Sequence, residues 1–94
     1  MSSLLWSVEA RGDLRRIDQW LTVNASGEIA TRMLAAIGER STLLLDFPRA
    51  GPLGADNDRT LRVTGTPYIL LYRPRETGIE ILRILHNRQD WRPE

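Results

Sequence analysis

The spacing of apolar residues changes in the middle of the chain, and that change indicates the fold class. From Glu9 to residue 46 apolar residues recur every three or four positions, which is typical of amphipathic helices. After residue 59 they lie in short runs rich in β-branched and aromatic types, separated by GTP and PRETG, which is typical of strands joined by turns. Because helices and strands fall in separate parts of the chain, we predict an α+β fold with a single domain spanning residues 1–94.

A strand and a first helix are expected at the N-terminus. Residues 4–8 (LLWSV) alternate as in a short strand, and a helical period begins at Glu9. The apolar stripe of this helix consists of Ala10, Leu14, Ile17 and Leu21. Asp13, Arg16 and Asp18 are assigned to positions off the stripe. The pattern predicts an amphipathic helix of about four turns.

A second helix follows after the break NASGE. Ser26 is suited to cap its first turn, and Glu28 lies where the helix dipole favours a carboxylate. The apolar face continues to about Asp46, and Phe47-Pro48 ends it. The short link makes the two helices an antiparallel hairpin.

Residues 49–59 are expected to form a loop, and the three runs after it predict an antiparallel meander. A two-residue turn at Gly65 and Thr66 brings Arg62 opposite Ile69, and opposed residues share a face. The face predicted to pack on the helix hairpin carries Leu61, Val63, Tyr68, Leu70 and Tyr72. The other face carries Arg62, Ile69, Leu71 and Arg73.

The last strand is apolar in both parities, so it requires cover on both sides. Two helices can cover one face of a sheet this small. We therefore expect Ile69, Leu71 and half of the last strand to form an exposed apolar surface that a protein partner covers. Two other covers stay open: a homodimer, or the C-terminal residues led by Trp91. The register also stays open, because a slip of one residue exchanges Arg83 and Leu85 for Ile84 and His86.

Composition excludes several kinds of site. The chain has no cysteine and one histidine, so we expect no metal and no cofactor. It has no run of 18 apolar residues and no basic N-terminal region followed by a long apolar stretch, which predicts a cytoplasmic protein that does not enter a membrane. A net charge of +1 gives no field that would attract nucleic acid.

His86 is the residue from which any acid–base mechanism would start, because it is the one side chain that titrates near neutrality without help. With Arg62 and Arg88 it could form an RNA-cleaving site, in which a base takes a 2′-hydroxyl proton and arginines hold the phosphate. A histidine at a strand end is also common as a hydrogen-bonded structural residue, so both interpretations stay open. Ile69, opposite Arg62, cannot bind an oxyanion.

Five segments taken in order (EARGDLRRIDQWL, FPRAG, RTLRV, TPYILLYR and IEILRILHNRQDW) resemble the RelE/ParE superfamily of bacterial type II toxin–antitoxin toxins. The resemblance covers essentially the whole chain. It implies a four-stranded RelE/ParE-like sheet and a cognate antitoxin, ParD-like or similar, that forms a hetero-oligomer with the toxin. A role in plasmid stabilisation is implied in the same way.

Within this superfamily, RelE-like members cut mRNA on the ribosome, whereas ParE-like members inhibit DNA gyrase by binding. The arginine that RelE-like nucleases place after the aromatic residue of the middle strand falls on Ile69, and Trp91 is nearest to their catalytic tyrosine. These departures favour the ParE branch, with no catalytic residue and with DNA gyrase as the expected target. The alternative, a ribosome-dependent mRNA endoribonuclease, would use Arg62, His86 and Arg88. Partner contacts are expected from Arg62, Ile69, Leu71, Arg73, His86, Arg88 and Trp91.

Overall fold

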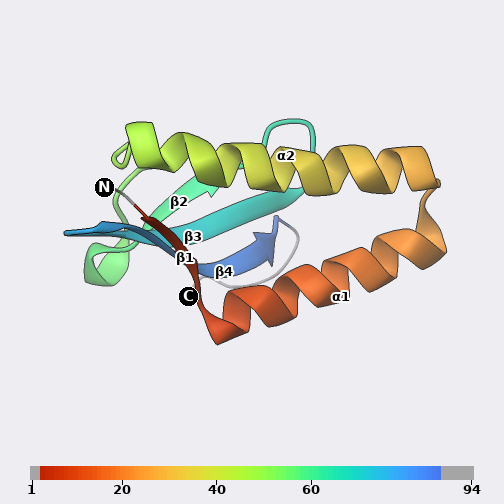
Figure 1. Ribbon diagram of the computed structural model, residues 1–94, viewed down its shortest axis with the longest axis horizontal. Helices are drawn as coiled ribbons and strands as arrows, with labels where there is room; N and C mark the ends of the chain where they lie inside the picture. Colours follow the sequence, from red (N-terminus) through yellow and green to blue (C-terminus); the bar gives the residue numbers. More distant parts are fainter. Residues whose placement is uncertain (1–2, 88–94) are drawn as a thin grey trace.

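The fold is a helix hairpin packed on a four-stranded sheet, and the computed structural model describes residues 3–87 (Figure 1). The elements in chain order are β1 (Ser3–Trp6), α1 (Val8–Asn24), α2 (Gly27–Asp46), the short 3-10 helix η1 (Ala55–Asn57), β2 (Arg59–Arg62), β3 (Tyr68–Arg75) and β4 (Gly78–His86). This order confirms the predicted α+β class, the helix hairpin and the three-stranded meander.

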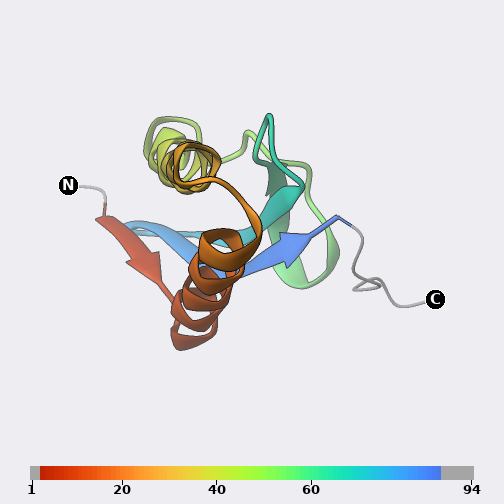
Figure 2. The same ribbon diagram turned by 90° about the vertical axis from the view of Figure 1, so that its right-hand side faces the viewer.

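The sheet has the strand order β1-β4-β3-β2. β1 runs parallel to β4 at one edge, and β2, β3 and β4 are antiparallel to their neighbours. Figure 2 shows β1 and β2 at opposite sides of the sheet. The pairing of Arg62 with Ile69 confirms the predicted register. The turn itself is centred on Thr64 and Gly65, one residue earlier than predicted, because the Thr66 N–H donates to the Val63 carbonyl (3.1 Å).

Serine side chains cap both helices. The Ser7 hydroxyl accepts a hydrogen bond from the backbone N–H of Ala10 (2.9 Å), so α1 begins at Val8, one residue earlier than predicted. The Ser26 hydroxyl accepts one from the N–H of Ile29 (3.2 Å), which confirms the predicted cap of α2. Each cap satisfies one of the N–H groups that the first turn of a helix leaves without an intrahelical partner.

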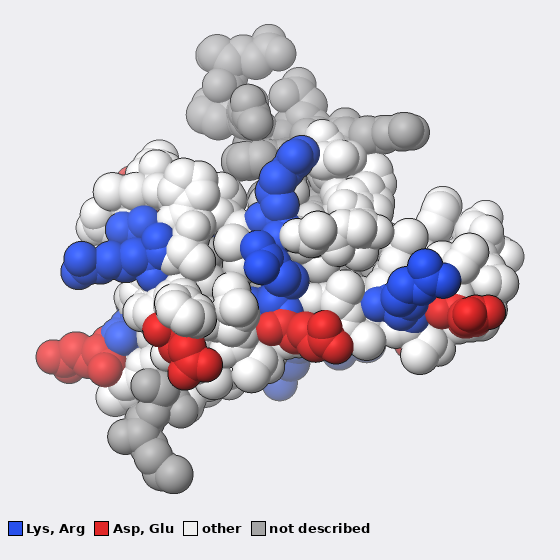
Figure 3. Space-filling model, turned by 90° about the horizontal axis from the view of Figure 1, so that it is seen from above, with Lys and Arg blue, Asp and Glu red and all other residues white. Residues whose placement is uncertain are grey.

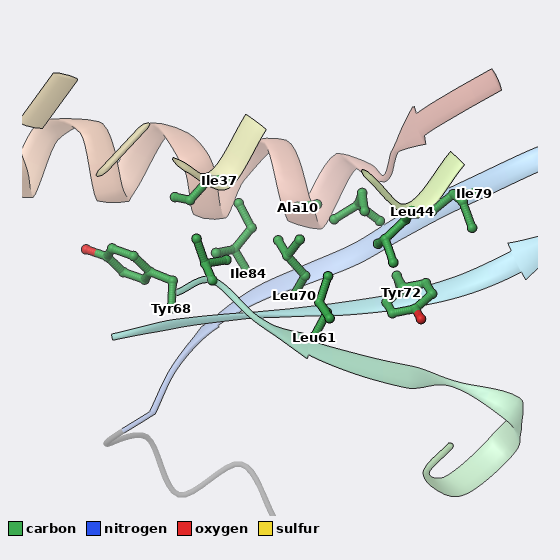
Figure 4. Packing of buried hydrophobic residues seen from close by; sticks show 11 residues of the cluster. Ala10, Ile37, Leu44, Leu61, Tyr68, Leu70, Tyr72, Ile79 and Ile84 are labelled. Atoms are coloured by element: carbon green, nitrogen blue, oxygen red, sulfur yellow. The ribbon is translucent and has the colours of Figure 1, made fainter. Parts of the chain in front are cut away.

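The hydrophobic core lies between the hairpin and one face of the sheet (Figure 4). The five sheet residues predicted to face the helices are all buried: Leu61, Val63, Tyr68, Leu70 and Tyr72. Ala10 of α1 and Ile37 and Leu44 of α2 pack against them. The alternation read from the sequence therefore identified the core face of β2 and β3 correctly.

The segment after α2 is tied to the core through one tyrosine. The Tyr72 hydroxyl donates a hydrogen bond to the carbonyl of Pro48 (2.9 Å) and accepts one from the backbone N–H of Gly51 (3.0 Å). Tyr72 is fully buried; its bond with Gly51 is buried as well, and its bond to Pro48 is part-buried. They fix the course of the chain between α2 and β2.

A β-bulge in β4 settles the register that the sequence left open. Leu71 pairs with Arg83 and Tyr72 pairs with Ile81, so Leu82 is an extra residue in β4. Because of this extra residue, Ile81 before the bulge and Ile84 after it both face the helices, although their spacing is odd. The bulge explains why β4 is apolar in both parities.

The expected exposure of Ile69 and Leu85 is wrong. Ile69 is 8% exposed and Leu85 is 7% exposed, and the two residues are direct partners across β3 and β4. Both residues belong to the outer face of the sheet, which we expected to remain open because the two helices cover the other face. Leu71 is half-buried. The large apolar side chains that are exposed lie instead on β1, the helices and the loops: Leu5, Val8, Trp20, Val23, Ile29, Phe47 and Leu53.

Candidate functional site

The sheet separates the residues predicted to contact a partner. Arg62, Ile69, Leu71 and Arg73 belong to the face that points away from the helices. His86 pairs with Tyr68 and therefore lies on the helix-facing side. Arg88 and Trp91 lie outside the described residues. The predicted set thus does not form one continuous surface within residues 3–87.

Arg73 is engaged in a structural contact. Its Nε donates to Oδ1 of Asp58 (2.6 Å), and its Nη2 donates to the carbonyl of Asp56 (3.4 Å). These bonds hold the turn that contains η1, in which Asp56 and Asn57 adopt positive φ angles. Arg62 makes no such ion pair among the described residues, and it is exposed.

His86 and Tyr68 meet at the end of the sheet. Their ring centroids are 5.7 Å apart and the ring planes are nearly perpendicular (86°), an edge-to-face contact. Burial raises the pKa of the Tyr68 phenol above its ordinary value, so this group is protonated at neutral pH.

These two rings line a cavity of about 540 Å³ between the helices and the end of the sheet, which we call the hairpin cavity. Its apolar lining includes Ile17, Trp20, Leu21, Met33, Pro67, Tyr68 and Ile84. Its polar lining consists of Asp13, Arg16 and His86. The volume is in the range of about 300–1,000 Å³ that is usual for ligand pockets, and a largely apolar lining with a few polar groups is typical of them.

Asp13 is held at this cavity by four hydrogen bonds. It is buried, although the sequence pattern assigned it to a position off the apolar stripe. Its Oδ1 accepts from Arg16 Nη2 (2.6 Å) and Arg83 Nη2 (3.0 Å). Its Oδ2 accepts from Arg83 Nε (2.7 Å) and the backbone N–H of Ile84 (2.9 Å). Burial alone would raise the pKa of Asp13, but these hydrogen bonds outweigh burial and hold the pKa below its ordinary value.

This arrangement arises because β1 is shorter than β4. The pairing of the two strands ends at Trp6 and Ile81, so the edge of β4 beyond that point has no neighbouring strand. Residues at the start of α1 take its place. The Ser7 N–H donates to the Ile81 carbonyl (2.9 Å), and the Ser7 hydroxyl donates to the Leu82 carbonyl (2.7 Å). Together with the Asp13–Ile84 bond, these two bonds from Ser7 satisfy the edge of β4 around the bulge.

Sequence reasoning missed Asp13 and Trp20, and a signal existed for the first. Asp13 is three residues after Ala10 and four before Ile17, so it lies on the same side of the helix as the apolar stripe. A carboxylate in that position needs cationic partners, and Arg16 and Arg83 supply them. Within residues 3–87 no group of three or more histidine and acidic side chains could hold a metal ion. None of the helices in this part of the chain is both long and apolar enough to cross a bilayer.

The family model described as the ParE toxin of the parDE type II toxin–antitoxin system matches residues 4–91. The chain belongs to the ParE toxin family. It is 30% identical to a Sinorhizobium fredii protein named as a candidate toxin, Y4kP, over 87 residues. The matched region covers 92% of this chain and 88% of that protein. A solved structure of a chromosomal ParDE toxin–antitoxin system from P. aeruginosa superposes with a TM-score of 0.79 at 30% identity, covering 92% of this chain and 96% of the other.

The ParE assignment confirms the resemblance read from the sequence segments and the four-stranded sheet that it implied. This ParE-family chain is a toxin of a type II toxin–antitoxin system, and its partner is an antitoxin.

Proposed function

We propose that this ParE-family toxin inhibits growth by binding DNA gyrase in the cytoplasm, and that it performs no RNA cleavage of its own. The observation that carries the proposal is the placement of Arg62 and His86. Arg62 pairs with Ile69 and leaves the sheet on the side away from the helices, whereas His86 pairs with Tyr68 on the helix side. A general base and a phosphate-binding cation must reach the same phosphodiester. Side chains on opposite faces of a sheet cannot reach one phosphodiester together.

The position of Ile69 supports the same conclusion. It is buried, and it presents an apolar side chain at the place where a phosphate contact would be most useful. The ribonuclease alternative would therefore depend on Arg88, which lies outside the described residues.

The distribution of charge on one face of the protein also favours a protein target. On the face seen in Figure 3 the arginines lie in separate groups, with acidic residues close to each. Nucleic-acid-binding proteins usually carry a continuous basic stripe, which this face lacks. Arg62 and Leu71 on the outer face and His86 at the hairpin cavity remain our proposed partner contacts.

The order in which synthesis stops after induction tests the proposal. Cells expressing the toxin are pulsed with labelled thymidine and labelled methionine, with co-expressed antitoxin as the control. Inhibition of gyrase predicts that thymidine incorporation falls first and that the antitoxin prevents the fall. An early loss of methionine incorporation, with mRNA cut on ribosomes, would favour the ribonuclease.

A further inference from the structure

We infer that the hairpin cavity binds a bulky apolar side chain from an antitoxin helix. We also infer that Arg16 pairs with a carboxylate of that antitoxin helix, about one turn from the inserted side chain. The inference rests on the antitoxin partnership described above, and it adds the site and the chemistry of recognition.

The apolar part of the site extends beyond the cavity. Trp20 is 59% exposed although it lines the cavity, and Val23, one turn further along α1, is 82% exposed. On α2, Ile29 is 40% exposed and precedes the cavity residue Met33 by one turn. Apolar side chains therefore continue from the cavity along both helices toward the link between them. A strip of this kind, with one cavity, suits an amphipathic helix that inserts one anchoring side chain.

The charge at the rim of the hairpin cavity indicates which polar group of the antitoxin would bind there. Asp13 already accepts four hydrogen bonds, and Arg83 directs both Nε and Nη2 to it. Arg83 also interacts electrostatically with Glu9. Arg16 gives one hydrogen bond, through Nη2, and its side chain is 67% exposed.

A guanidinium has five N–H donors, so Arg16 keeps further donors that an external ligand could use. Asp13 fixes the position of Arg16 beside the apolar lining, and Asp13 is itself fixed by β4. A cation held at the rim of an apolar cavity is complementary to an apolar group with a carboxylate next to it.

The test uses the full-length toxin and the antitoxin encoded beside it. The affinity of the antitoxin is measured for Arg16→Gln, for Met33→Trp, which fills the cavity, and for Arg15→Gln, a matched control on the exposed side of α1. We expect the first two changes to weaken binding by about tenfold or more, because each removes a buried anchor or a charge-assisted bond. The control should remain within about twofold of the wild type.

A charge exchange gives a readout that a merely structural role of Arg16 would not produce. Arg16→Glu should weaken binding further, and changing one particular acidic residue of the antitoxin helix to lysine should restore it. Restoration at no acidic position would overturn the carboxylate assignment.

The remaining outcomes separate this inference from the proposed function. If the cavity variants bind antitoxin like the wild type, the site is wrong although the toxin assignment stands. If those variants instead abolish a toxin dimer, or increase protease cleavage within residues 88–94, a second copy or the chain's own C-terminal residues occupy the cavity, and the inference is overturned. If the wild-type toxin binds no antitoxin, both conclusions fail.

Discussion

The backbone N–H of Ile84 donates a hydrogen bond to Oδ2 of Asp13 (2.9 Å), across 71 residues of sequence. A carboxylate of the first helix thereby takes the place of a strand neighbour at the edge of β4. The same carboxylate holds Arg16 at the rim of the hairpin cavity. One residue thus links the stability of the fold to the shape of the candidate binding site.

Asp13→Asn should destabilise the toxin by about 2–3 kcal/mol. The loss is smaller than for a fully buried ion pair because both arginines remain largely open to water. Urea unfolding measures the change, and Asp18→Asn, on the exposed side of the same helix, is the matched control. Equal stability of the two variants would show that the contact contributes little.

The stability contributed by Asp13 should depend on pH in one direction. Its folded-state pKa lies below the ordinary value of 3.8, so the folded protein binds fewer protons there than the unfolded chain. The contribution is complete above pH 3.8 and is lost as the pH falls through the folded-state pKa. Unfolding measured from about pH 6 to about pH 3 should show the wild type approaching Asp13→Asn at the acidic end. If the difference in unfolding free energy between the wild type and Asp13→Asn stays constant over this range, the assignment is contradicted.

Tyr72→Phe should cost about 1–3 kcal/mol, because it leaves the Gly51 N–H and the Pro48 carbonyl without their partner in a buried setting. Tyr68→Phe is a suitable comparison, since the Tyr68 hydroxyl makes no hydrogen bond within residues 3–87. Thermal or urea unfolding should show that Tyr72→Phe is clearly less stable than Tyr68→Phe. The reverse order would be inconsistent with the contacts observed here.

Two glycine substitutions should change stability in opposite directions. A Cβ on Gly78, which has φ of +149°, would lie 1.8 Å from the Ser3 carbonyl oxygen, so Gly78→Ala should disrupt the pairing of β1 with β4. A Cβ on Gly38 meets nothing within 4 Å, and Gly38→Ala should stabilise α2 by about 0.5–1 kcal/mol. Hydrogen exchange of the β1 amides should rise in Gly78→Ala. Unchanged protection there would contradict the predicted clash.

Much of the fold follows from local patterns. Ser26 marked the start of α2, and the turn residues after β2 indicated the register of β2 and β3, because both depend on a few neighbouring residues. The bulge at Leu82 could not be read in the same way. A strand that is apolar in both parities does not show at which residue its faces exchange, and only the pairing with β3 reveals it.

The candidate site was less accessible from the sequence. A sheet covered by helices on one face predicted an exposed Ile69, but Ile69 and its cross-strand partner Leu85 are both buried. Asp13 looked like one charged residue among several on α1, because its partner Arg83 is 70 residues away. Sites assembled from distant segments depend on tertiary placement, and the spacing within one helix carries only part of that information.

Supercoiling by purified DNA gyrase tests the central claim most directly. The full-length toxin is added to gyrase and relaxed plasmid, with and without a stoichiometric excess of antitoxin. We predict that the toxin blocks supercoiling and that the antitoxin restores it. Normal supercoiling at toxin concentrations that stop growth in cells would contradict the account.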